Sequence, residues 1–189
     1  MANICVFCGS RSGDSKQFAE AAATLGSLIA RYGHTLVYGG GSTGIMGAIA
    51  DAVLAKSGQI IGVIPQQLAR PELMHSGVVD MRITVDMHER KALMHSLADV
   101  YVALPGGYGT LEELFEAVTW AQLELHTREV KVLNIDSLYD GLVATLDRMT
   151  EAGFLSLGCR RHLEVFSTVD EMSAWISAIA REDQSNPLA

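Results

Sequence analysis

The sequence contains no apolar run that approaches the roughly 18 residues a helix needs to cross a bilayer, so we expect no membrane-spanning segment. Residues 1–4 carry no basic segment of the kind that begins a signal peptide. We therefore expect a cytoplasmic protein without a membrane partner.

Basic residues are also scarce: 14 Lys and Arg stand against 22 Asp and Glu, which gives a formal net charge of −8. Proteins that bind nucleic acids broadly rely on a basic surface to neutralise phosphates. The composition therefore argues against a nucleic-acid partner. A small anionic ligand remains compatible with it if positive charge and helix ends gather at one place.

Cysteine occurs three times, and Cys5 and Cys8 form a C-x-x-C pattern. This pattern can mark a redox or zinc site. In an extended strand, however, the two Cα atoms would lie about 10 Å apart with side chains on opposite faces, beyond disulfide reach. No second cysteine pair completes a zinc set. We predict buried, unreactive thiols and no metal site.

The chain has 189 residues, of which 49% are hydrophobic and 19% charged, as in a globular domain. Short apolar runs alternate with amphipathic helical patterns, which predicts an α/β fold whose parallel sheet of about seven strands has helices on both faces. We predict one domain over residues 1–181 and a frayed polar tail over 182–189. The expected strands are 4–7, 35–38, 60–64, 81–85, 100–104, 130–135 and 163–166, and the expected helices are 15–31, 45–56, 87–98, 111–124, 138–152 and 169–181.

Residues 104–113, Leu-Pro-Gly-Gly-Tyr-Gly-Thr-Leu-Glu-Glu, follow an expected strand and lead into a helix. The glycines let a ligand approach the main chain closely, and a helix opened at Thr110 attracts an anion, most often a phosphate. Glu112 and Glu113 add negative charge beside this site, which indicates chemistry on a phosphorylated ligand. Alternatively, Glu113 forms a capping box with Thr110, and both carboxylates are favoured there by the helix dipole.

A second glycine loop, residues 39–44, matches G-x-G-x-x-G between an expected strand and helix. No acidic residue ends the next strand to hold a ribose hydroxyl, and no Lys follows Gly44 as in a P-loop. The loop is either a tight turn with close packing or a second wall of the same pocket. In the latter case its binding residues would be Gly40, Gly41 and Ser42.

Arg90 falls in the first turn of the helix expected over 87–98, near a positive helix end where a cation is disfavoured. This position implies a partner, either a carboxylate or a phosphate. A salt bridge to Asp86 or Glu89 is the alternative. His88 does not begin an H-E-x-x-H zinc motif, because Ala92 breaks the pattern.

Two strings, Met-His-Glu-Arg-Lys-Ala at 87–92 and Pro-Gly-Gly-Tyr-Gly-Thr-Leu-Glu-Glu at 105–113, resemble the signatures of the LOG ("lonely guy") family of cytokinin riboside 5′-monophosphate phosphoribohydrolases. The resemblance extends over segments 8–10, 38–47 and 119–123. It implies a Rossmann-like fold and at least a homodimer with its site near the subunit interface. We expect no cofactor.

The resemblance also implies a reaction, the hydrolysis of the N-glycosidic bond of N6-substituted adenosine monophosphates, and in many members of AMP, to free base and ribose 5-phosphate. Arg90 and Glu113 would be the catalytic pair. The positions that match substrate-binding residues of the family are Glu72, Arg90, Lys91, Gly106, Gly107, Tyr108, Gly109, Thr110, Leu111, Glu112 and Thr119.

Two other functions would use the same fold. A nucleotide or cofactor carrier, similar to molybdenum-cofactor carrier proteins, would keep the glycine cradle without the chemistry. An NAD(P)-dependent oxidoreductase is disfavoured by the missing acidic ribose ligand. The carboxylate beside the phosphate site, together with Arg90, favours the hydrolase.

Overall fold

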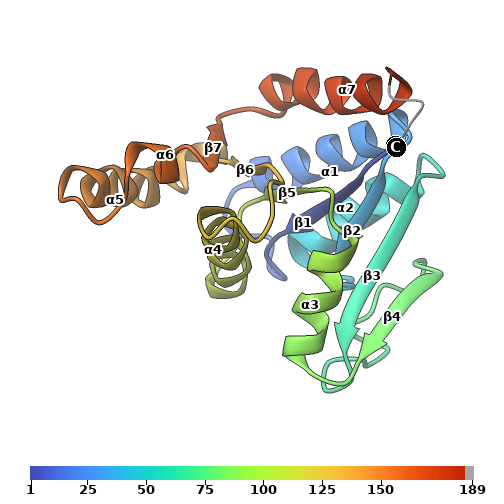
Figure 1. The fold of residues 1–189 in the computed structure, drawn as a ribbon. Coiled ribbons are helices and arrows are strands. Elements are labelled where there is room, and N and C mark those ends of the chain that lie inside the picture. The colour runs from blue at the N-terminus through green and yellow to red at the C-terminus, as the bar shows by residue number, and fades with distance from the viewer. Residues whose placement is uncertain (186–189) are drawn as a thin grey trace.

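The computed structural model describes residues 1–185 and contains seven strands joined mainly by helices (Figure 1). The strands are β1 (Asn3–Phe7), β2 (Thr35–Tyr38), β3 (Gln59–Pro65), β4 (Asp80–Thr84), β5 (Val100–Ala103), β6 (Val130–Leu133) and β7 (Leu163–Phe166). The helices are α1 (Lys16–Arg31), α2 (Gly44–Leu54), α3 (Met87–Leu97), α4 (Tyr108–Gln122), α5 (Asp140–Glu151), α6 (Leu157–Arg160) and α7 (Val169–Ser185), with a 3₁₀ turn η1 (Ile135–Ser137).

All neighbouring strands pair in parallel, in the order β4-β3-β2-β1-β5-β6-β7. The prediction of an α/β fold with about seven parallel strands is confirmed. Strand order reverses between β1 and β5, and in open parallel sheets ligands bind in the crevice that such a reversal leaves at the carboxyl ends of the strands. A ligand site is therefore expected at the loops that follow β1 and β5.

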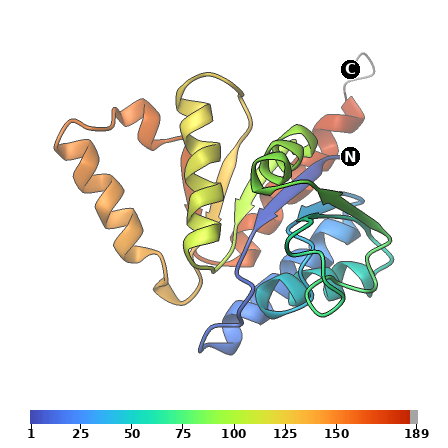
Figure 2. The same cartoon turned by 90° about the horizontal axis from the view of Figure 1, so that it is seen from below.

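Helices cover both faces of the sheet, and each face has its own apolar core. On one face α1, α2 and α7 pack against alternate strand residues such as Ile4 and Leu36. On the other, α3, α4 and α5 pack against the intervening residues, such as Cys5 and Val37. The near-continuous apolar character of the strands follows from this two-sided burial. In Figure 2, α4 and α5 lie apart from each other on the side of the sheet that ends in β7.

The helices differ from the sequence prediction most clearly at α4, α6 and α7. Helix α4 begins at Tyr108 with Gly107 as its N-cap, so Thr110 lies inside the first turn and does not open the helix. Helix α6 was not predicted, because its four residues are too short to show a helical period. Helix α7 extends to Ser185. The remainder of the tail predicted over 182–189 lies outside the described residues.

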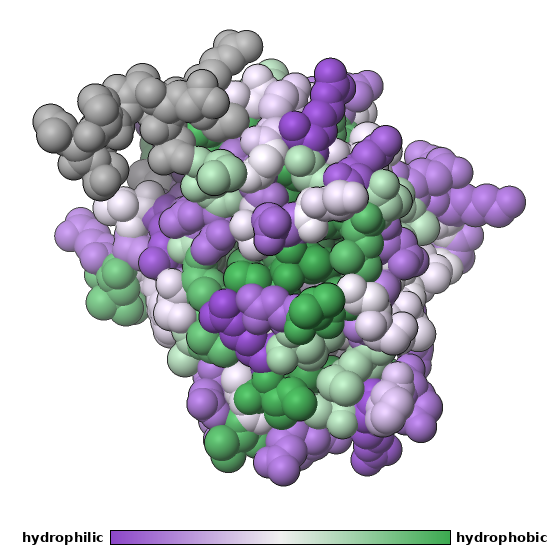
Figure 3. Space-filling model, turned by 90° about the vertical axis from the view of Figure 1, so that its right-hand side faces the viewer, coloured by the Kyte–Doolittle hydropathy of each residue, from purple (hydrophilic) through white to green (hydrophobic). Residues whose placement is uncertain are grey.

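The edge strand β4 is the most exposed part of the sheet, and apolar side chains remain accessible along it and at its ends, including Val79, Ile83 and Val85. Figure 3 shows this side of the molecule, where hydrophobic surface lies among polar side chains. Within the part of the chain that is described, no helix is long and apolar enough to span a bilayer.

Candidate active site

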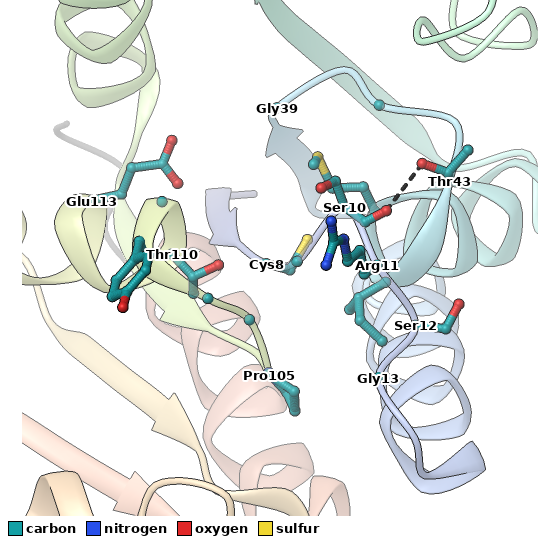
Figure 4. A pocket seen from close by; sticks show the side chains of 18 of the residues that line it. Cys8, Ser10, Arg11, Ser12, Gly13, Gly39, Thr43, Pro105, Thr110 and Glu113 are labelled. Atoms are coloured by element: carbon teal, nitrogen blue, oxygen red, sulfur yellow. Dashed lines mark hydrogen bonds between the residues drawn. The ribbon is translucent and has the colours of Figure 1, made fainter.

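A cleft of about 820 Å³ opens at the carboxyl edge of the sheet, where the loops after β1 and β5 diverge. Residues 8–14 and the second glycine loop form one wall, and residues 105–113 form the other (Figure 4). The two walls are tied at their base, because the Gly9 amide donates a hydrogen bond to the Pro105 carbonyl at 3.0 Å. The cleft thus lies at the strand reversal that the topology singles out.

The loop after β5 is folded tightly onto the start of α4. A Cβ added at Gly106 would lie 2.0 Å from Thr110 Oγ1, so only glycine fits there. In contrast, a Cβ at Gly107 or Gly109 would meet nothing within 4 Å, and both residues line the cleft. Because the first N–H groups of a helix have no intrahelical acceptors, this open space at the start of α4 can receive an anion.

Arg90 and Glu113 form a buried ion pair on the cleft. Arg90 Nη1 donates to Glu113 Oε1 at 2.6 Å, and both side chains are only 10% exposed. Arg90 Nε also donates to the Val63 carbonyl at 3.0 Å, which fixes the guanidinium plane. Glu113 Oε2 has no donor among the described residues, so it is free to face a ligand. Burial raises the pKa of the Glu113 carboxyl, and the Arg90 charge opposes this rise.

The partner of Arg90 among the described residues is thus a carboxylate, as one hypothesis held, and the alternative of a salt bridge to Asp86 or Glu89 is wrong for physical reasons. Asp86 is the N-cap of α3 and accepts from the amides of His88 and Glu89. Glu89 accepts from the Val85 amide. Glu113 does not form a capping box with Thr110, because Thr110 lies within α4 and the Glu113 side chain turns to Arg90.

Lys91 does not enter the cleft but joins α3 to α4 beside the ion pair. Its ammonium donates to Glu112 and, at 2.6 Å, to Glu116. Glu116 also contacts His95 Nε2 at 3.1 Å, and His95 Nδ1 contacts the Tyr101 hydroxyl at 2.9 Å. Burial lowers the pKa of His95. These contacts hold the two helices in register so that Arg90 and Glu113 meet.

The second glycine loop contributes Gly39, Gly41 and Thr43 to the cleft, whereas Gly40 and Ser42 do not line it. The Gly40 carbonyl accepts from the His75 amide, and the Ser42 amide donates to the Leu73 carbonyl. These bonds fasten the loop to the 66–79 connection. A Cβ at Gly39 would lie 2.6 Å from Arg90 Nη2, so this glycine makes room for the guanidinium.

The structure brings together most, but not all, of the predicted site residues. Glu72, Leu111 and Thr119 lie outside the cleft of the single chain: Glu72 and Thr119 are exposed, and Leu111 is half-buried against the α4-side core. The predicted residues that line the cleft are Gly41, Arg90, Gly106, Gly107, Tyr108, Gly109, Thr110, Glu112 and Glu113. Lining residues that sequence reasoning did not select include Cys8, Arg11, Asp14, Met46 and Leu138.

The cysteine prediction is confirmed in its geometry. Cys5 and Cys8 are free and buried, and they pack into the cores on opposite faces of the sheet. Burial raises the pKa of both thiols, so neither is a thiolate at neutral pH.

Comparison with known proteins identifies the family. A family model described as "possible lysine decarboxylase" matches residues 46–176. LOGL1 of Oryza sativa subsp. japonica, a probable cytokinin riboside 5′-monophosphate phosphoribohydrolase, is 44% identical over 181 residues, 96% of this chain and 81% of the relative. LOG4 of Arabidopsis thaliana, a cytokinin riboside 5′-monophosphate phosphoribohydrolase, is 44% identical over 169 residues, 89% of this chain and 79% of the relative. The chain belongs to the LOG family.

Two solved structures share the fold of this LOG-family chain. The molybdenum cofactor binding protein from the phototrophic bacterium Rippkaea orientalis superposes with a TM-score of 0.71 at 23% identity, covering 94% of this chain and 96% of that chain. The molybdenum cofactor carrier protein from Chlamydomonas reinhardtii gives 0.70 at 21% identity, covering 96% and 98%. At this identity the likeness concerns the fold alone.

The description of the family model names a decarboxylase, whereas the relatives bear the names of phosphoribohydrolases. Decarboxylation with pyridoxal phosphate requires a lysine that forms a Schiff base with the cofactor. Among the described residues that line the cleft there is no lysine. The ionisable side chains that line it are those of Cys8, Arg11, Asp14, Arg90, Tyr108, Glu112 and Glu113.

Proposed function

We propose that this chain is a phosphoribohydrolase that cleaves the N-glycosidic bond of N6-substituted adenosine 5′-monophosphates, and of AMP, and releases the free base and ribose 5-phosphate. The buried Arg90–Glu113 pair beside the open glycine turn of α4 is the observation that carries this proposal. The names of the 44% identical relatives support the same reaction.

Glu113 is proposed as the catalytic carboxylate. As the bond between C1′ and the base breaks, positive charge develops on the ribose, as in other glycoside hydrolyses. A carboxylate near C1′ stabilises that charge and accepts a proton from the attacking water. The water oxygen bonds to C1′, and the electron pair of the broken bond stays with the base. The proton that Glu113 accepts from the water is returned through solvent to a ring nitrogen of the base, which completes the free base and restores the carboxylate.

Arg90 is proposed to keep Glu113 ionised and to hold its carboxylate in position toward the ligand. Its guanidinium is held by the Val63 carbonyl and contacts only one carboxylate oxygen, so Oε2 is left for water or the sugar. The N–H groups at residues 107–110 would then hold the 5′-phosphate, about one helical turn from Glu113. Apolar lining residues at the cleft, including Ile64, Leu68 and Met87, offer a surface for the base and its substituent.

The test is incubation of the protein with AMP and with isopentenyladenosine monophosphate, followed by chromatography for the free base and ribose 5-phosphate. Equimolar release of both products is expected. Tight nucleotide binding without turnover would instead support the alternative that this chain is a carrier. The solved carrier structures, at 21–23% identity, share only their fold with this chain.

We also propose that the protein forms at least a homodimer and resides in the cytoplasm. The resemblance to LOG enzymes implies a site near a subunit interface. The exposure of Thr119 on α4, outside the cleft of its own chain, supports this proposal. A partner subunit is one way for this residue to approach a nucleotide. Light scattering coupled to size-exclusion chromatography should give a mass of at least two chains.

A further inference from the structure

The charged side chains in and beside the cleft differ in whether they already have an ion-pair partner. Arg90 is bound to Glu113, and Lys91 lies outside the cleft, bound to Glu112 and Glu116. Arg11 lines the cleft, is exposed, and makes no hydrogen bond or ion pair with any described residue. Among the cleft residues that the structure describes, Arg11 therefore carries the uncommitted positive charge.

The main chain of Arg11 is held beside the start of the glycine turn. A Cβ added at Gly9 would lie 3.3 Å from the carbonyl oxygens of both Arg11 and Pro105, so these peptides are neighbours. On the other side, Gly44 packs against the Ser10–Arg11 peptide, where a Cβ would come within 2.5 Å of the Arg11 nitrogen. The Thr43 hydroxyl also donates to the Ser10 carbonyl at 3.0 Å. Figure 4 shows the Arg11 side chain entering the space between the two walls.

A phosphorylated ligand needs positive charge that this cleft otherwise lacks. The exposed carboxylate of Asp14 lines it and repels a dianion, and the charge of Glu112 is already paired with that of Lys91. The start of α4 supplies the equivalent of only about half a positive charge. A guanidinium binds phosphate oxygens through directed, charge-assisted hydrogen bonds.

We infer that Arg11 binds the 5′-phosphate from the wall opposite residues 106–110, and that it sets the selectivity of this site for a phosphorylated over an unphosphorylated nucleoside. The inference rests on the proposed function for the position of the phosphate. It assigns Arg11 to substrate binding and leaves the bond-breaking step to Arg90 and Glu113.

The test separates binding from turnover. The probes are the carbocyclic analogue of AMP, in which a methylene replaces the ribose ring oxygen so that no glycosidic bond is present, and the matching unphosphorylated nucleoside. Calorimetry would measure both affinities for the wild type, Arg11→Ala and Arg11→Lys. Arg161→Ala is the matched control, because it removes the same charge from an exposed residue at the end of α6.

Loss of one charge-assisted contact predicts that Arg11→Ala binds the phosphorylated analogue about tenfold or more weakly, with unchanged affinity for the nucleoside. Arg11→Lys should keep part of the preference, and Arg161→Ala all of it. Unchanged affinity for the phosphorylated analogue, or an equal loss for both ligands, would overturn the inference. A wild-type protein that prefers the phosphorylated analogue yet never hydrolyses AMP would contradict the proposed function and leave the role of Arg11 standing.

Discussion

Arg90 Nη1 lies 2.6 Å from Glu113 Oε1, although the two residues are 23 positions apart and belong to different helices. Arg90 is in the first turn of α3, and Glu113 is in the second turn of α4. The dipole of α3 disfavours the positive charge of Arg90, and a carboxylate on the next helix neutralises this charge.

Replacing Glu113 by Gln should lower kcat for AMP hydrolysis about 100-fold or more, the scale of a lost acid–base group, with little change in KM. The amide keeps the size of the side chain and can still accept from Arg90. Steady-state kinetics with detection of the free base would measure the effect. Glu20→Gln, an exposed position on α1, is the control. Near-normal turnover of Glu113→Gln would remove this residue from the mechanism.

Arg90→Ala should nearly abolish hydrolysis, because Glu113 would remain buried without its counter-charge. Arg90→Lys should recover only part of the activity, since an ammonium cannot reproduce the planar contacts to Val63 and Glu113. The comparison of kcat and KM across both variants is decisive. A rise in KM alone, with kcat intact, would make Arg90 a binding residue.

The pH dependence of kcat/KM should report Glu113. Burial raises its pKa above the ordinary value of the side chain while Arg90 opposes the rise, and the active form is the carboxylate. Activity should therefore fall as the pH is lowered through an apparent pKa above about 4.3, the unperturbed value of Glu. The residual activity of Glu113→Gln should lack this acid limb. A wild-type limb at or below the unperturbed value would contradict the assignment.

Gly39→Ala should damage catalysis through Arg90. The new Cβ would come within 2.6 Å of Arg90 Nη2, and the end of a flexible side chain can move away. The displaced guanidinium would then leave Glu113, so kcat should fall toward that of the Arg90 variants. The melting temperature should fall as well, because the Glu113 carboxylate stays buried without its counter-charge. Gly141→Ala on α5, where a Cβ meets nothing within 4 Å, is the control. Full activity of Gly39→Ala would show that the position of Arg90 is not critical.

Gly109→Ala should weaken substrate binding without destabilising the fold. The space beside this glycine is empty in the chain itself, and alanine favours a helical turn by up to about 1 kcal/mol relative to glycine. Thermal stability should be kept or raised, while KM for AMP increases because the methyl group occupies the proposed phosphate space. An unchanged KM would place the phosphate elsewhere.

The sequence was sufficient to predict the sheet and the loops at its carboxyl edge, because two-sided burial leaves a strong apolar signal in each strand. It misplaced the start of α4, since Thr110 resembles an N-cap while Gly107 and Gly109 resemble a loop. The glycines are tolerated in the first helical turn because the helix is held by packing, Leu114 and Ala117 being buried in the core.

The family resemblance grouped Arg90 with Glu113 as a catalytic pair, but the residues alone did not predict that the two form an ion pair. Arg90 could be recognised as a charge that requires a partner, but the choice between Asp86, Glu89 and Glu113 depends on how α3 and α4 cross over the sheet. Arg11 was not selected as a site residue, because a single arginine in a turn has neither period nor motif. The positions of Glu72 and Thr119 outside the cleft likewise depend on tertiary structure.

Because strand order reverses between β1 and β5, the cleft is complete only when both halves of the sheet have folded. The walls of the cleft come from opposite halves of the polypeptide, and α3 carries Arg90 across from the outermost strand β4 to the centre of the sheet. A chain in which only one half has folded presents Arg90 or Glu113 but not both, and only one wall of the cleft. Turnover would then appear late in renaturation, and its recovery would serve as an assay for completed assembly of the whole domain.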